Sequence, residues 1–309
     1  MGGGGANPPV MLVLGDSVLW GQGLQPWNKF SELVRDQLKY RPEYAGLTLD
    51  VRARSGAIIG ASSGAAPPRY VPSEVPWSYP SVIQQCDGYP GNPDEVRVVL
   101  LDGGINDVSV KTIVDPATKP ADLSALVERY CHVDMVTLLN RVTGKFSNPA
   151  CRIIVTGYYQ ILSAASSPAP TVSFLELFGI TTASTIFSTA TGFSNVVALS
   201  ELFWKESDRA LAQAVKDVNP NCGNRITFVP SGFTAANSLF QAGSLLWIFS
   251  GTPPFVDAAD DFKDFRAQVC SNYYADGTVP CATCRFASVG HPTANGAIQY
   301  YQQIMQAFP

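Results

Sequence analysis

The chain has 309 residues, of which 46% are hydrophobic, which is enough for one large domain or two small ones. Its formal net charge of −4 argues against nucleic acid as a partner, because such a site needs a basic face. The 21 lysines and arginines form no cluster, so an anionic membrane surface is not indicated either. No linker rich in Pro, Gly or Ser separates two periodic halves, and we therefore expect one domain over residues 1–309 with long insertions.

The first nine residues read M-G-G-G-G-A-N-P-P. They lack the basic and apolar regions of a signal peptide. Ala6 also breaks the myristoylation pattern, which requires Ser or Thr there. We interpret residues 1–9 as a cloning remnant or a disordered segment joined to a mature domain.

Five apolar runs predict β-strands, and helical periodicity fills the intervals between them. The predicted strands are Val10–Leu14, Leu47–Ala53, Val96–Leu101, Arg152–Thr156 and Ile226–Pro230. The apolar helix faces are Phe30, Leu33, Val34 and Leu38; Leu123, Leu126, Val127, Tyr130 and Val133; Leu211, Ala214, Val215 and Val218; and Ala294, Ala297, Ile298, Tyr301, Ile304 and Met305. Pro292 is expected to open the last helix. The alternation predicts an α/β fold with three α/β/α layers around a parallel sheet of about five strands.

Two long segments, Leu177–Ser200 and Ile226–Val256, carry no charged residue. Ser and Thr in the first, and Pro and Gly in the second, argue against a membrane span. Two interpretations stay open: insertions buried against the sheet, or an apolar wall or lid that binds an acyl group. The wall would be assembled from Phe174, Leu175, Phe178, Leu245, Leu246, Trp247 and Phe249. Among these, Phe178 and Trp247 are our candidate substrate-binding residues.

Four short blocks follow the predicted strands or open the last helix. In the first, Gly-Asp-Ser ends a buried strand, so Ser17 can expose its hydroxyl beside free backbone N–H groups. Ser-Gly-Ala around Gly56 follows the second strand, where a glycine lets a backbone N–H approach a ligand. Gly-Gly-Ile-Asn-Asp follows the third strand and offers the Asn106 amide. Gly-His-Pro near the C-terminus offers the imidazole of His291.

The order of these blocks resembles that of the SGNH (GDSL) hydrolases. G-D-S-V, S-G-A, G-G-I-N-D and H-P-T-A-N-G match the family's four blocks from about Val10 to the C-terminus. The chain looks most like the secreted actinobacterial-type esterases and lipases of that superfamily. The resemblance implies a flavodoxin-like SGNH fold, Ser17 as nucleophile and His291 as general base. It also implies an oxyanion hole made of the Ser17 N–H, the Gly56 N–H and the Asn106 side chain.

The last block departs from the family's Asp-x-x-His pattern, because Ser288 occupies the acidic position. Some members of the resembled group use a main-chain carbonyl there. We therefore expect the Ser288 carbonyl to orient His291, which makes the site a catalytic dyad. The competing possibility is a carboxylate from the nearby acidic stretch, namely Asp257, Asp260, Asp261, Asp264 or Asp276.

A rival nucleophile is Ser62, because Gly60–Gly64 satisfies the G-x-S-x-G pattern of α/β-hydrolases. Pro67 and Pro68 follow closely and disfavour the helix that this motif needs. His132, the only other histidine, is expected to be packed or solvated within a helix. Two alternative functions stay open: a carbohydrate acetyl esterase that uses the same site, and a non-catalytic SGNH-like binding domain.

Seven cysteines suggest an exported protein with up to three disulfides and one free thiol. Cys281 and Cys284 could form half of a zinc site, but no second pair completes it, so a disulfide or simple burial is favoured.

The sequence thus predicts a secreted serine esterase or lipase. It is expected to act as a monomer on a small-molecule or lipid ester, without cofactor or metal. Its predicted contact with a lipid interface is transient, and no transmembrane segment is expected.

Overall fold

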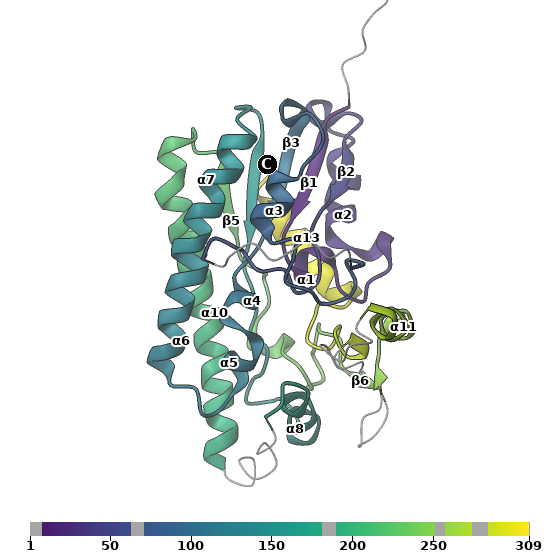
Figure 1. Ribbon diagram of the computed structural model, residues 1–309, viewed down its shortest axis with the longest axis vertical. Helices are drawn as coiled ribbons and strands as arrows, with labels where there is room; N and C mark the ends of the chain where they lie inside the picture. The colour runs from purple at the N-terminus through teal and green to yellow at the C-terminus, as the bar shows by residue number, and fades with distance from the viewer. Residues whose placement is uncertain (1–7, 63–70, 181–189, 251–256, 274–283, 309) are drawn as a thin grey trace, which may run out of the picture.

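A five-stranded parallel sheet forms the centre of the protein (Figure 1). The computed structural model describes residues 8–62, 71–180, 190–250, 257–273 and 284–308. The strand order is β2-β1-β3-β4-β5, and all neighbouring strands are parallel. The strands are β1 (Val10–Leu14), β2 (Thr48–Val51), β3 (Val96–Leu101), β4 (Arg152–Thr156) and β5 (Ile226–Val229). The predicted sheet is confirmed. Its central strands β1, β3 and β4 are mostly buried and therefore appear in the sequence as largely apolar runs.

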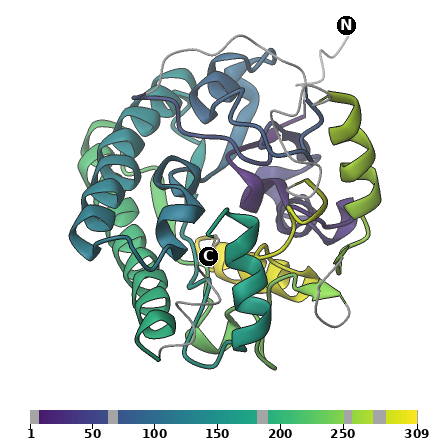
Figure 2. The same cartoon turned by 60° about the horizontal axis from the view of Figure 1, so that its bottom comes forward.

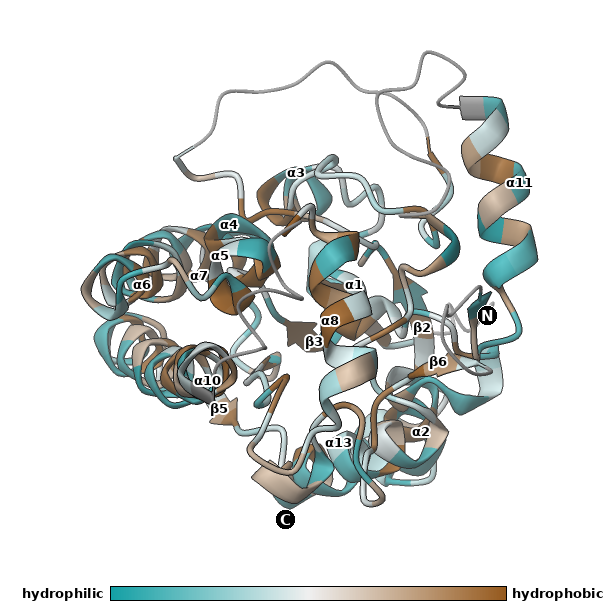
Figure 3. Ribbon diagram, turned by 90° about the horizontal axis from the view of Figure 1, so that it is seen from below, coloured by the Kyte–Doolittle hydropathy of each residue, from teal (hydrophilic) through white to brown (hydrophobic). Residues whose placement is uncertain are grey.

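Helices cover both faces of the sheet, which confirms the predicted three layers (Figure 3). On one face α2 (Phe30–Leu38) packs against α13 (Ala294–Gln306), with the Phe30 and Tyr300 rings stacked at 5.0 Å between centroids. The other face carries α3 (Val82–Asp87), α6 (Pro120–Val127), α7 (Met135–Lys145) and α10 (Ala190–Val218). Shorter 3₁₀ turns occur at Pro26–Asn28, Pro42–Tyr44, Pro93–Glu95, Asn219–Asn221 and Ala235–Asn237.

Two predicted helix faces need correction. A π-helical segment, Glu128–Asp134, joins α6 to α7. Its wider turn rotates the following face, so that Cys131 and Asp134 are buried while Val133 is 47% exposed. In α13, Tyr300 is buried and Ile298 is 43% exposed.

The prediction that Pro292 opens α13 is also wrong. The helix begins at Ala294, and the Thr293 hydroxyl caps it by accepting from the Gly296 N–H at 3.4 Å. Pro292 instead lies in a β-bridge with Leu246. Proline has no N–H to donate, so it is tolerated at such an edge, where no donor is required at that residue.

The carboxyl ends of the strands point to the lower end of the molecule in Figure 1, where the chain adds its insertions. Figure 2 brings this end forward. The elements here are α1 (Ser17–Trp20), α4 (Ile105–Val108), α5 (Val110–Val114), α8 (Pro168–Leu177), α11 (Lys263–Tyr273) and a small antiparallel sheet of β6 (Phe249–Ser250) and β7 (Asp257–Ala258). In Figure 3, α8 lies over the middle of this end and α11 at its periphery.

One disulfide, Cys270–Cys284, joins α11 to the segment that precedes α13. Among the described cysteines, four are free, namely Cys86, Cys131, Cys151 and Cys222. One disulfide is within the expected maximum of three, but the expectation of a single free thiol is wrong. Three of the four thiols are fully buried and pack as small hydrophobic groups. Burial raises the pKa of the Cys86 and Cys151 thiols to about 11. Cys284 is not free to bind zinc, and Cys281 lies outside the described residues.

The uncharged segments belong mostly to the core. Val196, Leu199, Leu239, Leu246 and Phe249 are all buried in the central hydrophobic cluster. This supports the interpretation of buried insertions, at least for the described parts of both segments. Among the described helices, none has the length and apolar character needed to cross a bilayer.

Candidate active site

Ser17 and His291, far apart in the sequence, meet at the carboxyl ends of the strands. The distance from His291 Nε2 to Ser17 Oγ is 2.7 Å. His291 Nδ1 lies 3.2 Å from the Ser288 carbonyl oxygen, which can only accept a hydrogen bond. Nδ1 therefore carries the proton, and the unprotonated Nε2 accepts from the Ser17 hydroxyl. A serine hydroxyl bonded to a neutral imidazole is the arrangement needed for nucleophilic attack.

The Gly-Asp-Ser turn is held by a buried carboxyl pair. Asp16 caps α1 by accepting from the Val18 N–H at 2.8 Å, and its other oxygen accepts from Tyr158 Oη at 2.7 Å. Asp102, at the end of β3, accepts from the Asp16 N–H at 2.7 Å. Burial raises the pKa of Asp16, and burial followed by the nearby Asp16 charge raises that of Asp102 well above its ordinary value. A Cβ atom at Gly15 would lie 2.0 Å from Asp102 Oδ1, so the turn needs glycine before Asp16.

The main chain around His291 is fixed by Trp247 and Tyr159. The Trp247 N–H donates to the His291 carbonyl at 2.7 Å, and the Gly290 N–H donates to the Trp247 carbonyl at 2.9 Å. Tyr159 Oη donates to the Gly290 carbonyl at 2.7 Å. Burial lowers the pKa of His291 to about 4, and the Arg266 charge lowers it as well. The imidazole is thus neutral over most of the pH range.

Two further groups that the sequence predicted lie beside Ser17. Gly56 has φ +78°, and a Cβ there would come within 2.7 Å of the Trp77 nitrogen, so glycine is needed at this turn. Asn106, in α4, donates from Nδ2 to the Ala57 carbonyl at 3.0 Å. An amide has two N–H bonds, so the second remains available to the site. Ser17 is the first residue of α1, where backbone N–H groups have no acceptor within the helix.

These groups face an apolar cavity of about 170 Å³. Its polar lining includes Ser17, Gly56, Asn106 and His291, while its apolar walls include Val110, Ile161, Phe174, Leu177, Phe178 and Val289. Of the predicted wall, Phe174 in α8 and Phe178 at the C-terminal end of that helix line this cavity. Leu175, Leu245, Leu246 and Phe249 do not line the cavity.

Three other predicted positions lie away from the cavity. Trp247 does not line it and contacts His291 through the main chain. The Ser62 hydroxyl donates to Asp134 at 2.7 Å, and Ser63 and Gly64 of its motif lie outside the described residues. His132 lies between the carboxylates of Glu128 and Asp217, at 2.5 and 2.7 Å.

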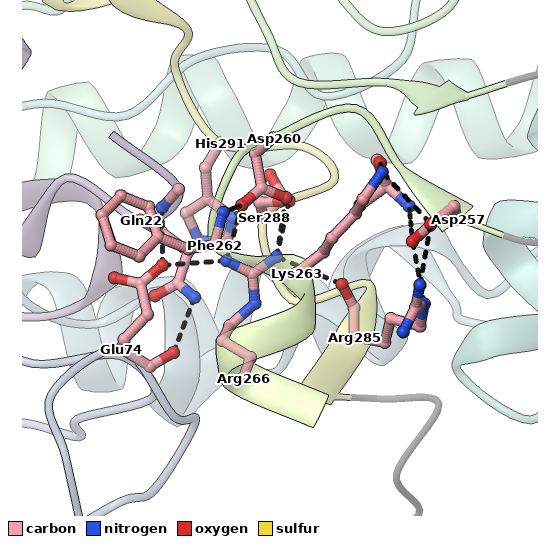
Figure 4. A network of polar contacts seen from close by, with 12 residues as sticks. Gln22, Glu74, Asp257, Asp260, Phe262, Lys263, Arg266, Arg285, Ser288 and His291 are labelled. Atoms are coloured by element: carbon pink, nitrogen blue, oxygen red, sulfur yellow. Dashed lines mark hydrogen bonds and ion pairs between the residues drawn. The ribbon is translucent and has the colours of Figure 1, made fainter. Parts of the chain in front are cut away.

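A cluster of buried charged residues behind His291 was not predicted from the sequence. Asp260 does not reach the imidazole; it accepts a hydrogen bond from the Ser288 hydroxyl and pairs with Arg266 at 2.7 Å (Figure 4). Asp257 pairs instead with Arg285 and Lys263. Asp276 lies outside the described residues. The run of acidic residues around Asp260 was the only indication of this cluster in the sequence.

Over the described ranges, no group of three or more His, Cys, Asp or Glu side chains is arranged to hold a metal ion. The site residues are those of acid–base and nucleophilic chemistry.

The fold is that of phospholipase A1 from Streptomyces albidoflavus NA297, with a TM-score of 0.51, 14% sequence identity, and 97% of this chain and 99% of that chain covered. A lipase from a goat rumen metagenome aligns with a TM-score of 0.49, 12% identity and 97% of each chain covered. Est24, a carbohydrate acetylesterase from Sinorhizobium meliloti, aligns with a TM-score of 0.42, 11% identity, and 97% of this chain and 98% of that chain covered. No protein-family model and no curated protein matches the sequence.

Proposed function

We propose that the protein is a serine carboxylic-ester hydrolase of the SGNH type, an esterase or lipase. The observation that supports it best is the 2.7 Å contact between Ser17 Oγ and His291 Nε2 at an apolar cavity. The similar fold of phospholipase A1 from Streptomyces albidoflavus NA297 is consistent with this class. Ser17 is the proposed nucleophile, His291 the general base, and the Ser288 carbonyl the group that orients His291.

In the first half-reaction, Ser17 Oγ attacks the ester carbonyl carbon while its proton passes to His291 Nε2. The carbonyl oxygen becomes an oxyanion, which accepts hydrogen bonds from the Ser17 N–H, the Gly56 N–H and the Asn106 amide. The tetrahedral intermediate collapses, the C–O bond to the alcohol breaks, and His291 protonates the leaving oxygen.

The second half-reaction hydrolyses the acyl-enzyme. A water molecule takes the place of the alcohol and loses a proton to His291 Nε2 as its oxygen attacks the acyl carbon. The same donors hold the second oxyanion. Collapse breaks the bond to Ser17 Oγ, which recovers its proton from His291, and the carboxylic acid leaves. No cofactor or metal ion takes part.

A fluorophosphonate serine probe, combined with p-nitrophenyl ester turnover, tests the proposal. We expect turnover and a single covalent adduct, which peptide mapping places on Ser17. An adduct on Ser62 would indicate the rival nucleophile. Absence of both labelling and turnover would indicate a binding domain.

The low pKa of His291 predicts an unusually acid-tolerant enzyme. The neutral base is required, so kcat/KM should stay level down to about pH 5 and fall tenfold per pH unit below about 4. Folding opposes protonation of this ring, so the contribution of His291 to the free energy of unfolding should decline as the pH falls from about 6.5 towards 4. The buried carboxyls of Asp107 and Asp208, whose pKa is raised by burial to about 7, act in the opposite direction, so the contribution is measured as the difference in unfolding free energy between the wild type and His291→Gln at each pH. A kcat/KM profile from pH 3 to 9 checks the activity, and an acid limb near 6.5 would contradict it.

We predict that acyl groups of moderate length are preferred over acetyl. Each methylene buried against Phe174, Leu177 and Phe178 should raise kcat/KM by up to about fourfold, from about 0.8 kcal/mol per methylene. A series of p-nitrophenyl esters of rising chain length measures this. Phe178→Ala should flatten the dependence, while Ile248→Ala, outside the cavity, should not. A strict acetyl preference would favour the carbohydrate acetyl esterase.

We also propose that the chain acts as one domain and one monomer outside the cytoplasm. One hydrophobic cluster extends from Met11 to Phe308, and the Cys270–Cys284 disulfide is compatible with an oxidising compartment. The substrate would be a small-molecule or lipid ester, met through transient contact with a lipid interface where the ester is a lipid.

A further inference from the structure

The main-chain carbonyl that orients His291 belongs to a turn with an unusual anchor. A side-chain carboxylate can be aimed by its own rotamer, but a backbone carbonyl is only as fixed as the turn that carries it. Ser288 O accepts from both the His291 N–H at 2.8 Å and His291 Nδ1 at 3.2 Å. What holds Ser288 therefore determines where the imidazole points.

Arg266, on α11, clamps this turn from inside the protein. Its side chain is 0% exposed. Nε donates to the Cys284 carbonyl at 2.9 Å, and Nη2 donates to the Arg285 carbonyl at 3.1 Å and to Ser288 Oγ at 3.2 Å. Cys270, one helical turn further along α11, is covalently joined to Cys284. The same helix face thus holds the turn by a disulfide and by a guanidinium.

Asp260 completes the contact with Ser288. It accepts from the Ser288 hydroxyl and pairs through both oxygens with Arg266, at 2.8 and 2.7 Å (Figure 4). Asp260 and Ser288 are almost completely buried. The Ser288 hydroxyl therefore donates to one member of an ion pair and accepts from the other, which leaves its side chain a single orientation.

Glu74 extends the cluster towards Ser17. It accepts from Arg266 Nη1 at 2.8 Å and from the Gly23 N–H at 2.9 Å, just beyond α1. A Cβ atom at Gly23 would lie 2.9 Å from the Ser288 Cβ, so the loop after the Ser17 helix packs directly on the His291 turn. The nucleophile and the base are thus fixed relative to each other through one buried network.

We propose that Asp260 and Arg266 are positioning residues, which act through the Ser288 hydroxyl to aim the imidazole of His291 at Ser17. This rests on the proposed ester hydrolysis. It differs from a triad, because the His291 ring nitrogens contact Ser288 O and Ser17 Oγ and no carboxylate of the described residues. Asp260 and Arg266 together hold a backbone carbonyl where a triad would place an acid.

The first test removes the Ser288 hydroxyl, which connects the Asp260–Arg266 pair to the His291 turn. Ser288→Ala keeps the carbonyl and deletes one oxygen, so it should fold; we expect kcat to fall about three- to tenfold with KM within about twofold. Asp260→Asn should lower kcat by about 10- to 100-fold. In the double variant the two losses should not multiply: kcat should stay within about 1.5-fold of Asp260→Asn alone. Asp257→Asn is the matched control, because Asp257 pairs with Arg285 of the same turn without reaching Ser288, and it should stay within about twofold of wild type.

The second test needs no turnover, so it separates this proposal from the proposed function. The chain has only two histidines, and ¹⁵N-labelled histidine with His132→Gln assigns the His291 ring. The wild type and Asp257→Asn should show one tautomer with Nδ1 protonated, and Ser288→Ala a mixture. This result in a protein without hydrolysis would uphold the positioning role while the proposed function fails.

The proposal is overturned if Ser288→Ala keeps both wild-type kcat and a single tautomer, or if the two losses multiply. A loss of about 10⁴ in Asp260→Asn would also overturn it, because that is the cost of neutralising a triad acid. Should Asp260→Asn fail to fold, as losing one partner of a buried ion pair can cause, the Ser288→Ala kinetics and tautomer decide.

Discussion

Ser17→Ala abolishes ester hydrolysis, with an expected loss in kcat of at least about 10⁴-fold, while Ser62→Ala leaves it nearly intact. The alanine removes the atom that would bond to the acyl carbon, and water must then attack without a covalent intermediate. Ser17 Oγ lies 2.7 Å from His291 Nε2 and lines the cavity. The Ser62 hydroxyl instead donates to Asp134 and accepts from Arg129 at 2.7 Å, so its partners are a pair of opposite charges and not a neutral imidazole.

Initial rates on p-nitrophenyl esters, with fluorophosphonate labelling of each variant, measure this difference. Thermal melts should match the wild type for Ser17→Ala, because the change only replaces the hydroxyl by a hydrogen atom and leaves a methyl group facing the cavity. Loss of activity in a folded Ser62→Ala, with Ser17→Ala still active, would move the nucleophile to the other motif.

The sheet could be predicted from the sequence because its information is local. Val10–Leu14, Val96–Leu101 and Arg152–Thr156 match the observed strands residue for residue. A buried parallel strand must be apolar on both faces, so its ends coincide with the ends of the apolar run. Helix faces were predicted less well, since the π-helical segment at Glu128–Asp134 changes the period in a way that no local pattern indicated.

The four blocks of the candidate site were also local, and the structure brings Ser17, Gly56, Asn106 and His291 to one cavity. The residues that hold the His291 turn in place could not be predicted from any local pattern. Different parts of the chain contribute this cluster, namely Glu74, Asp260, Arg266 and Ser288. Its charged groups contact one another only because the fold buries them together. From the sequence, five aspartates were equal candidates for a partner of His291, because only the tertiary fold distinguishes Asp260 from Asp257. Trp247 was misplaced for the same reason: an aromatic residue in an uncharged segment can pack in a core or line a cavity.

Asn106→Ala should lower kcat by about 10²–10³-fold with a smaller change in KM, which is the usual loss for one oxyanion donor. The Asn106 amide is already fixed before substrate binds, because Nδ2 donates to the Ala57 carbonyl at 3.0 Å. Its second N–H is then available to the cavity without any reorganisation. A donor aimed at developing charge contributes more in the transition state than in the ground state, so the effect falls on kcat.

The rate of phosphonylation by a fluorophosphonate gives an independent measure, because the phosphoryl oxygen gains negative charge in the same place as the ester oxyanion. We expect Asn106→Ala to slow phosphonylation together with kcat, and Asn140→Ala, an exposed asparagine on α7, to change neither. A rise in KM alone, with kcat and phosphonylation unchanged, would make Asn106 a substrate-binding or structural residue. The oxyanion would then depend on the two backbone donors, at Ser17 and Gly56.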